Sequence, residues 1–185
     1  MGVSLTRHVA FLRGVNNIGM ARRVSMADLR AWFEALGFRD VRTLLNSGNV
    51  VFSVPAGKRG ALARLEKTLA SRLGFSCRVT VLSGEEVIAA VQENPLSRVA
   101  TNPSRLLVFV LSDPADRELL RPLLRERWAP ERLAIGSRVA YLWCARGIGK
   151  SLLWGKVDRA LAGSGTGRNL RTMTKLMALV EAGDA

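Results

Sequence analysis

The residues best suited to chemistry lie in two short polar segments, each attached to an apolar run. The segment Arg13-Gly14-Val15-Asn16 follows the run 8–12, and Asn46-Ser47-Gly48-Asn49 stands between the runs 41–45 and 50–54. A guanidinium offers a fixed fork of donors that matches a carboxylate or a phosphate. Amide and hydroxyl groups can hold carbonyls or base edges, and glycine lets the backbone approach a ligand. We therefore expect a cleft for an anionic or amide-bearing ligand, lined by Arg13, Asn16, Asn46, Ser47 and Asn49.

The same two segments also have a purely structural explanation. Arg13 could pair with a nearby acid, and Asn16 and Asn17 could cap turns. The Asn-Ser-Gly-Asn segment is a good hairpin signal, and most such turns have no further role. The sequence leaves both explanations open.

A third segment, Gly147-Ile148-Gly149-Lys150-Ser151, is similar to the end of a phosphate-binding Walker loop. The full pattern requires a glycine where Cys144 stands, and the loop is too short to wrap a triphosphate, so an ATPase is not expected. Ser151 is a suitable helix N-cap, and Lys150 lies beside it. Together they predict a site for a single anion.

The glycine-rich segment 163–167 comes directly before Arg168 and Asn169. It lacks the dinucleotide-binding spacing and follows a predicted helix rather than a strand, so a Rossmann site is not expected. We interpret the segment as a flexible connection to a helix. Arg168 and Asn169 join Lys150 and Ser151 as the predicted anion-binding end of the site.

The chain is strongly basic, with a formal net charge of +13 over 185 residues and a pI near 11.4. Much of this charge is arginine scattered over predicted helix faces, which is typical of a solvated surface. The stretch 138–175 of the C-terminal third differs, because only Asp158 opposes its cations (Arg138, Arg146, Lys150, Lys156, Arg159, Arg168, Arg171 and Lys175). Such a cluster favours nucleic acid or a small phosphate-bearing ligand as the partner.

Residues for metal, redox or acid–base chemistry are scarce. His8 is the sole histidine and lies in a predicted buried strand, where a structural role is expected. Cys77 and Cys144 are far apart in sequence, which indicates reduced thiols in the cytoplasm rather than a disulfide framework. We expect no metal and no cofactor. The first residues contain no long apolar stretch, so neither a signal peptide nor a membrane partner is expected.

The order of elements predicts an α+β fold. A strand at 8–12, a helix capped by Ser25, a hairpin at 41–54, a helix at 62–73 and a strand at 78–82 give the ferredoxin-like split βαβ pattern, with both helices on one face of an antiparallel sheet. The sequence after residue 82 begins with an extra helix near Ser83 and then repeats the order strand, helix, hairpin and helix. We therefore predict a ferredoxin-like half at 5–83 and a similar α/β half at 84–185, packed as one compact unit.

Several motifs together resemble a bacterial family known only as domain of unknown function 1697. They are Arg13-Gly14-Val15-Asn16, Leu36-Gly37-Phe38, the segment 46–52 and the segment 166–176, so the resemblance runs from about His8 to Leu176. The chain departs from the family at Asn17-Ile18-Gly19, Asn46 and Leu170, where Val-Gly-Gly, Gln and Trp are usual. The resemblance implies a soluble bacterial α+β protein with ferredoxin-like elements, and it implies no activity.

Two functions from different classes fit these observations. The first is a non-catalytic binding module for a phosphate-bearing ligand, either a nucleotide or nucleic acid. The alternative is an enzyme acting on a small anionic or amide substrate, in which Arg13 would orient the ligand and Asn or Ser groups would stabilise developing charge. The missing general base weighs against the enzyme. A scaffold with purely structural loops is a third possibility.

Overall fold

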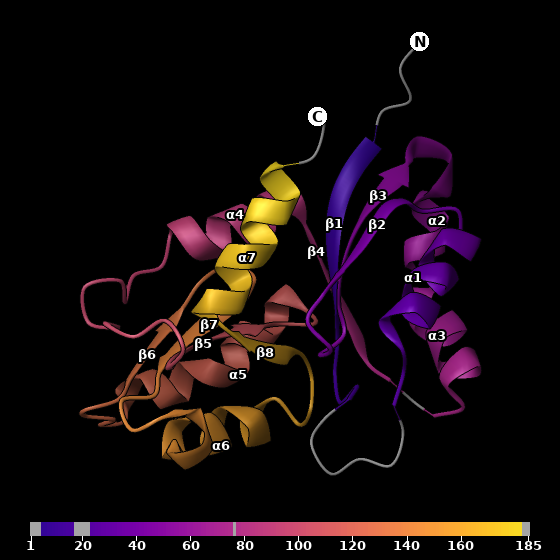
Figure 1. Cartoon of the computed structure of the whole chain (residues 1–185). Helices are drawn as coiled ribbons and strands as arrows, with labels where there is room; N and C mark the ends of the chain where they lie inside the picture. Colours follow the sequence, from indigo (N-terminus) through magenta and orange to yellow (C-terminus); the bar gives the residue numbers. More distant parts are fainter. Residues whose placement is uncertain (1–4, 17–22, 76, 183–185) are drawn as a thin grey trace. The chain divides into compact units, whose positions relative to one another are not determined.

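Two four-stranded antiparallel sheets organise the chain (Figure 1). The structure is a computed structural model, and it describes residues 5–16, 23–75 and 77–182. Each sheet belongs to a separate compact unit: the first comprises the described residues of Met1–Gly84 and Ala178–Ala185, and the second is Glu85–Met177. The predicted α+β class is thereby confirmed. The predicted packing of 5–83 and 84–185 as one compact unit stays a prediction.

The first sheet has the strand order β2-β3-β1-β4, which agrees with the predicted split βαβ arrangement. Every neighbouring pair is antiparallel, and Phe11 on the central strand pairs with Asn49. The elements of this unit are β1 (Leu5–Leu12), α1 (Met26–Ala35), β2 (Arg39–Leu44), β3 (Asn49–Pro55), the 3₁₀ turn Ala56–Lys58, α2 (Arg59–Leu62), α3 (Leu65–Leu73) and β4 (Val79–Ser83).

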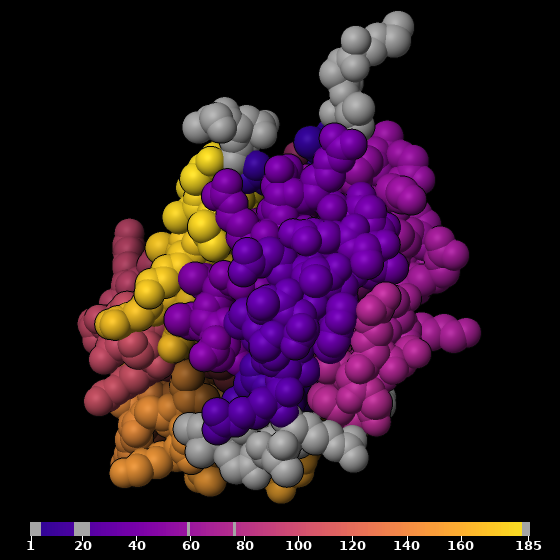
Figure 2. Space-filling model, turned by 45° about the vertical axis from the view of Figure 1, so that its right-hand side comes forward, coloured from indigo at the N-terminus to yellow at the C-terminus, as the bar shows by residue number. Residues whose placement is uncertain are grey.

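The helices of the first unit cover one face of its sheet. Ser25 caps α1 as expected, with its Oγ accepting from the Asp28 N–H at 2.9 Å. Leu29 and Phe33 of α1, one helical turn apart, are fully buried with Leu65 and Leu69 of α3. They pack in one cluster with the strand residues that point to the same face, among them Ala10, Leu12, Val50 and Phe52. Figure 2 shows this helix-covered side of the unit.

The second sheet has the order β6-β7-β5-β8, so its strands occupy the same relative positions as those of the first. The elements are α4 (Gly84–Gln92), β5 (Leu106–Val110), the 3₁₀ turn Pro114–Asp116, α5 (Arg117–Leu120), the 3₁₀ helix Arg121–Arg125, β6 (Arg132–Ile135), β7 (Val139–Trp143), the 3₁₀ turn Ile148–Lys150, α6 (Leu152–Ala160), β8 (Thr166–Asn169) and α7 (Leu170–Glu181).

Both faces of the second sheet are buried. Leu107 and Phe109 of β5 pack in one cluster with Leu153 and Val157 of α6. On the opposite face, Tyr141 donates its hydroxyl to the Ala90 carbonyl of α4 at 3.0 Å. Figure 1 shows α5 and α6 on one side of this sheet and α4 on the other. None of the described helices combines the length and apolar character needed to cross a bilayer.

The segment expected to be a flexible connection contains the edge strand β8. Thr166 pairs with Val110 and Arg168 with Val108. Gly165, at φ +81°, lies so close to β5 that a Cβ there would stand 2.3 Å from the Val110 carbonyl oxygen. The prediction was wrong because Thr-Gly-Arg-Asn has no apolar alternation, and pairing with β5 makes it a strand.

Candidate functional site

The two polar segments of the first unit lie side by side. The Leu12 N–H, at the end of β1, donates to the Gly48 carbonyl at 2.8 Å. Gly48 has φ +70°, and a Cβ there would stand 2.8 Å from Leu12 Cβ, so this turn requires glycine. The Arg13 N–H then donates to the Arg78 carbonyl at 2.9 Å. Arg13 and the Asn46–Asn49 turn therefore stand at the same end of the first sheet.

Two of the predicted ligand-binding asparagines hold the backbone instead. Asn16, at φ +56°, donates from Nδ2 to the Val24 carbonyl, and its Oδ1 accepts from the Val24 N–H, both at 2.8 Å. Asn49 is fully buried, and its Nδ2 donates to the Leu44 carbonyl at 3.0 Å and to Ser47 Oγ at 2.9 Å. The structural explanation therefore accounts for these side chains, whereas Arg13 is half-buried and Asn46 is exposed. Asn17 lies outside the described residues.

The start of α6 is capped by two groups of the protein itself. Ser151 is the N-cap, as predicted, and its Oγ accepts from the Trp154 N–H at 3.0 Å. The Glu131 carboxylate accepts from the Leu153 N–H at 3.2 Å. A negative charge at a helix N-terminus is favourable because the first N–H groups point toward it. Glu131 therefore supplies at this helix end the anion that the sequence assigned to a ligand.

Arg168 and Asn169 are neighbours on β8 but point to opposite faces of the sheet. Asn169 Oδ1 accepts from the Thr172 N–H at 2.9 Å, which caps the start of α7. Arg168 Nη1 donates to Thr166 Oγ1 at 2.9 Å and to the Gly167 carbonyl at 2.8 Å. Burial lowers the pKa of the Arg168 guanidinium to about 10, so it is still charged at neutral pH.

Exposed cations gather at one end of the second sheet. Trp143, the last residue of β7, pairs with Leu106 and with Arg132, and the last residue of β8, Asn169, pairs with Leu107. The segment before β5, the first residue of β6 and the segments after β7 and β8 therefore all lie at the same end of the sheet. We name their exposed cations the strand-end cluster: Arg105, Arg132, Arg146, Lys150 and Arg171.

Sequence reasoning identified only part of this cluster. Arg146, Lys150 and Arg171 belong to the basic stretch 138–175, but Arg105 and Arg132 lie outside that stretch. They are brought to the same end by strand pairing. The Arg105 Nη1 donates to the Ala145 carbonyl at 3.0 Å, and the Cys144 N–H donates to the Arg105 carbonyl at 3.0 Å, which ties the start of β5 to the loop after β7.

The predicted site residues fall into two groups, one in each unit. Arg13, Asn16, Asn46, Ser47 and Asn49 lie in the first unit, and Lys150, Ser151, Arg168 and Asn169 lie in the second. That both groups line a single cleft stays a prediction.

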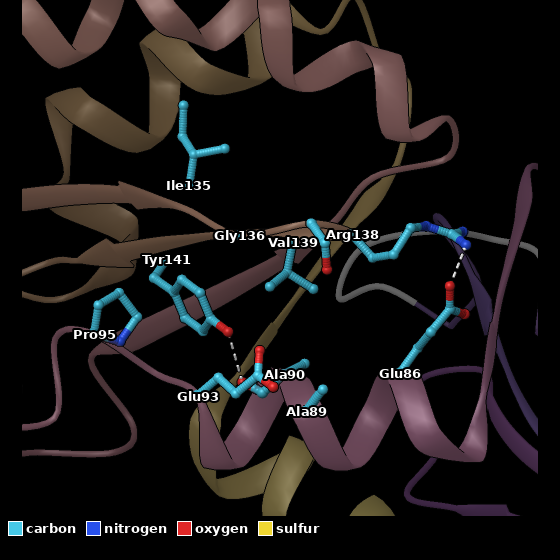
Figure 3. Close-up of a pocket in the computed structure, with 11 residues that line it drawn as sticks. Glu86, Ala89, Ala90, Glu93, Pro95, Ile135, Gly136, Arg138, Val139 and Tyr141 are labelled. Carbon is cyan, nitrogen blue, oxygen red and sulfur yellow. Dashed lines mark hydrogen bonds and ion pairs between the residues drawn. The ribbon is translucent and has the colours of Figure 1, made fainter.

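A pocket of about 240 Å³ lies between α4 and the turn that joins β6 to β7 (Figure 3). Glu86 of α4 and Glu93, the residue directly after this helix, line the pocket, and Arg138 forms an ion pair with Glu86, with Nη1 2.7 Å from Oε1. Tyr141 forms part of its wall, and burial, with a smaller contribution from Glu93, raises the pKa of Tyr141 to about 12. No residue of the predicted site lines this pocket, although the seven-residue spacing of the two glutamates was visible in the sequence.

Another cavity, of about 360 Å³, lies in the first unit. Lys58, Arg64 and Thr68 are its polar side chains, and Ala35 and Leu36 from the end of α1 complete one wall. The sequence analysis missed this cavity as well, because its lining combines the end of α1 with the segment that leads into α3.

Groups suited to metal or nucleophilic chemistry are engaged in the fold. His8 is half-buried on β1, where its Nδ1 donates to the Thr6 carbonyl at 3.0 Å and its ring stacks on Phe52. Cys77 and Cys144 are buried free thiols, and burial raises the pKa of Cys77 to about 11. Across residues 5–16, 23–75 and 77–182, no three His, Cys, Asp or Glu side chains are grouped to hold a metal ion.

Comparison with known proteins identifies relatives of undefined activity. Residues 5–141 match a family model described as "Protein of unknown function (DUF1697)". Among solved structures, the conserved bacterial protein SP0830 from Streptococcus pneumoniae is similar, with a TM-score of 0.75 and 22% identity over 96% of this chain and 99% of that chain. At this identity the likeness shows a shared fold. No curated protein matches the chain.

Proposed function

The chain belongs to the family of proteins of unknown function DUF1697, and we propose that it is a binding module for a phosphate-bearing ligand, either nucleic acid or a nucleotide. The strand-end cluster is the observation that carries this proposal. Its five exposed cations stand around one end of a single sheet in a chain of net charge +13. Lys150, Ser151, Arg168 and Asn169, assigned to the anion-binding end from the sequence, all lie in the same unit.

The width of the cluster favours a ligand with several phosphates. Its cations come from segments attached to all four strands, β6-β7-β5-β8. Neighbouring strands are about 4.8 Å apart, so the cluster is about 14 Å wide. That span suits a run of nucleotides better than one phosphate, and Glu131 already caps the α6 N-terminus at which a single anion would bind. Nucleic acid is therefore the form of the ligand that we favour.

Salt-dependent binding of a short fluorescent single-stranded oligonucleotide, followed by anisotropy, tests the proposal. Neutralising each phosphate of a single strand contributes about −0.7 to the slope of log K against log salt, so five contacts predict about −3.5. The triple variant Arg146→Gln/Lys150→Gln/Arg171→Gln should bring that slope to about −1.4.

A matched control separates the cluster from the overall charge. The triple variant Arg30→Gln/Arg39→Gln/Lys67→Gln removes the same number of exposed cations from the first unit. It should retain most of the wild-type slope. An equal loss in both variants, or no binding by the wild-type protein at low salt, would contradict the proposal. A nucleotide that binds where the oligonucleotide does not would restrict the ligand to a small molecule.

A further inference from the structure

The pocket beside α4 has a chemical character opposite to that of the strand-end cluster. Three charged side chains line it, Glu86, Glu93 and Arg138, so its net charge is −1. It lies by the β6–β7 turn, where Ile135 pairs with Ala140, whereas the strand-end cluster lies where Arg132 pairs with Trp143. A locally negative pocket in a chain of net charge +13 selects a cation rather than a phosphate.

The two glutamates that line the pocket have different surroundings. Glu86 lies in α4, and Glu93 directly follows the helix with its N–H still donating to the Ala89 carbonyl at 2.9 Å. Their seven-residue spacing therefore places them on the same face, about 10.5 Å apart along the helix axis. Glu86 is held by Arg138 in the 2.7 Å ion pair. For Glu93, no cation of the described part of the chain lies within ion-pair distance. Glu93 is therefore the carboxylate that a positively charged ligand can reach.

The surface between the two glutamates is small and apolar. Ala89 and Ala90 of α4 lie between them, and Figure 3 shows Val139 and the Tyr141 ring on the opposite side. The Tyr141 hydroxyl is held by its hydrogen bond to the Ala90 carbonyl. A volume of about 240 Å³ is below the usual range of about 300–1,000 Å³ for ligand pockets, so the ligand is short.

We propose that this pocket binds the ammonium group of a short aliphatic amine, with the Glu93 carboxylate as its counter-ion and the apolar surface of Ala89, Ala90 and Val139 around its alkyl chain. The Glu86–Arg138 ion pair adds no net charge to the pocket. An ammonium group has three N–H donors, and the oxygens of the Glu93 carboxylate can accept hydrogen bonds from them. This site is independent of the phosphate-binding function proposed above.

The test uses n-butylammonium as the probe and backbone amide chemical shifts as the readout. The expected result is a saturable shift confined to residues 84–93 and 135–141. The isosteric n-butanol and the anion butyrate should bind at least tenfold more weakly, because neither carries the positive charge. Glu93→Gln should weaken butylammonium binding at least tenfold, and its amide spectrum reports whether the variant is folded.

Glu85→Gln is the matched control, since Glu85 is exposed on α4 and does not line the pocket. It should bind butylammonium like the wild-type protein. Equal binding of butylammonium and butanol, unchanged binding in Glu93→Gln, or the absence of shifts around the pocket would overturn the proposal. A Gly-Lys-Gly peptide with blocked ends distinguishes the source of the ammonium group. If the peptide binds as tightly as butylammonium, the site accepts a lysine side chain of a protein or peptide. If butylammonium binds more tightly than the peptide, the site is assigned to a small-molecule amine.

Discussion

The carboxylate of Glu131 caps helix α6 from a distance of 22 residues in sequence, with Oε2 3.2 Å from the backbone nitrogen of Leu153. The loop that carries Glu131 is itself held, because the Glu131 N–H donates to the Trp128 carbonyl at 2.7 Å. The first turn of α6 contains no acid of its own. Glu131 thus supplies the negative charge that a helix N-terminus favours, directly before Arg132 of the strand-end cluster.

Replacing Glu131 by glutamine should have opposite effects on stability and on ligand binding. Loss of the charge should lower the free energy of unfolding by about 0.3–1 kcal/mol, because the interaction with the helix dipole is lost. The same change removes a repulsion of phosphate, so we expect oligonucleotide affinity to rise about threefold. Urea denaturation and anisotropy measure the two effects. Glu126→Gln, at an exposed position nearby, is the control and should leave stability unchanged. Unchanged affinity in Glu131→Gln would mean that phosphates do not reach the start of α6.

Asn49 should matter for stability more than for binding. Asn49→Ala removes the donor to both the Leu44 carbonyl and Ser47 Oγ at a fully buried position, and we expect a loss of about 1–3 kcal/mol in the free energy of unfolding. The neighbouring Asn46 is exposed, so Asn46→Ala should change stability by less than about 0.5 kcal/mol. Urea denaturation of the pair gives the comparison. A stable Asn49→Ala variant with impaired ligand binding would instead support the ligand-binding role predicted from the sequence.

Gly165 and Gly163 provide a matched pair for testing strand β8. Both have positive φ, +81° and +83°, so alanine at either position should cost about 1–2 kcal/mol. A Cβ at Gly163 meets nothing within 4 Å, whereas at Gly165 it would stand 2.3 Å from the Val110 carbonyl oxygen. Gly165→Ala should therefore destabilise the protein by about 1–3 kcal/mol more than Gly163→Ala, measured by urea denaturation. Equal effects would show that Gly165 is not packed against β5 in solution.

The regular elements could be predicted because their signals are local. The cap at Ser25, the glycine that follows α1 and the alternation around the first hairpin are all contained within short windows of sequence. Strand β8 lacked such a signal, since Thr166–Asn169 forms a strand only through its pairing with β5.

The candidate sites depended more on distant contacts. Ser151 was predicted as a cap from its own position, but the second capping group, Glu131, comes from another segment. Arg105 and Arg132 join the strand-end cluster through the register of β5, β6 and β7. Glu86 and Glu93 share a face through the helical spacing of α4 and the residue that follows it, but Arg138 and Tyr141 on the far side of their pocket come from the β6–β7 hairpin. The two sides of that pocket are separated by about 40 residues in sequence, so a local sequence pattern could not predict it.

Tyr141 is the sole tyrosine of the chain, so the absorbance of its phenolate reports directly on the pocket beside α4. Burial, aided by the charge of Glu93, raises its pKa to about 12, against about 10 in an unfolded chain. Since the folded state holds the proton more tightly, the contribution of Tyr141 to stability is complete below pH about 10 and is lost as the pH rises toward 12.

We expect the folded protein to show little phenolate at pH 10, where the urea-unfolded chain is half ionised. The Glu93→Gln variant should titrate at a lower pH than the wild-type protein but still above the unfolded chain, because burial is the larger cause. A native titration midpoint near pH 10 would show that Tyr141 is open to solvent, and the pocket as described would then be absent.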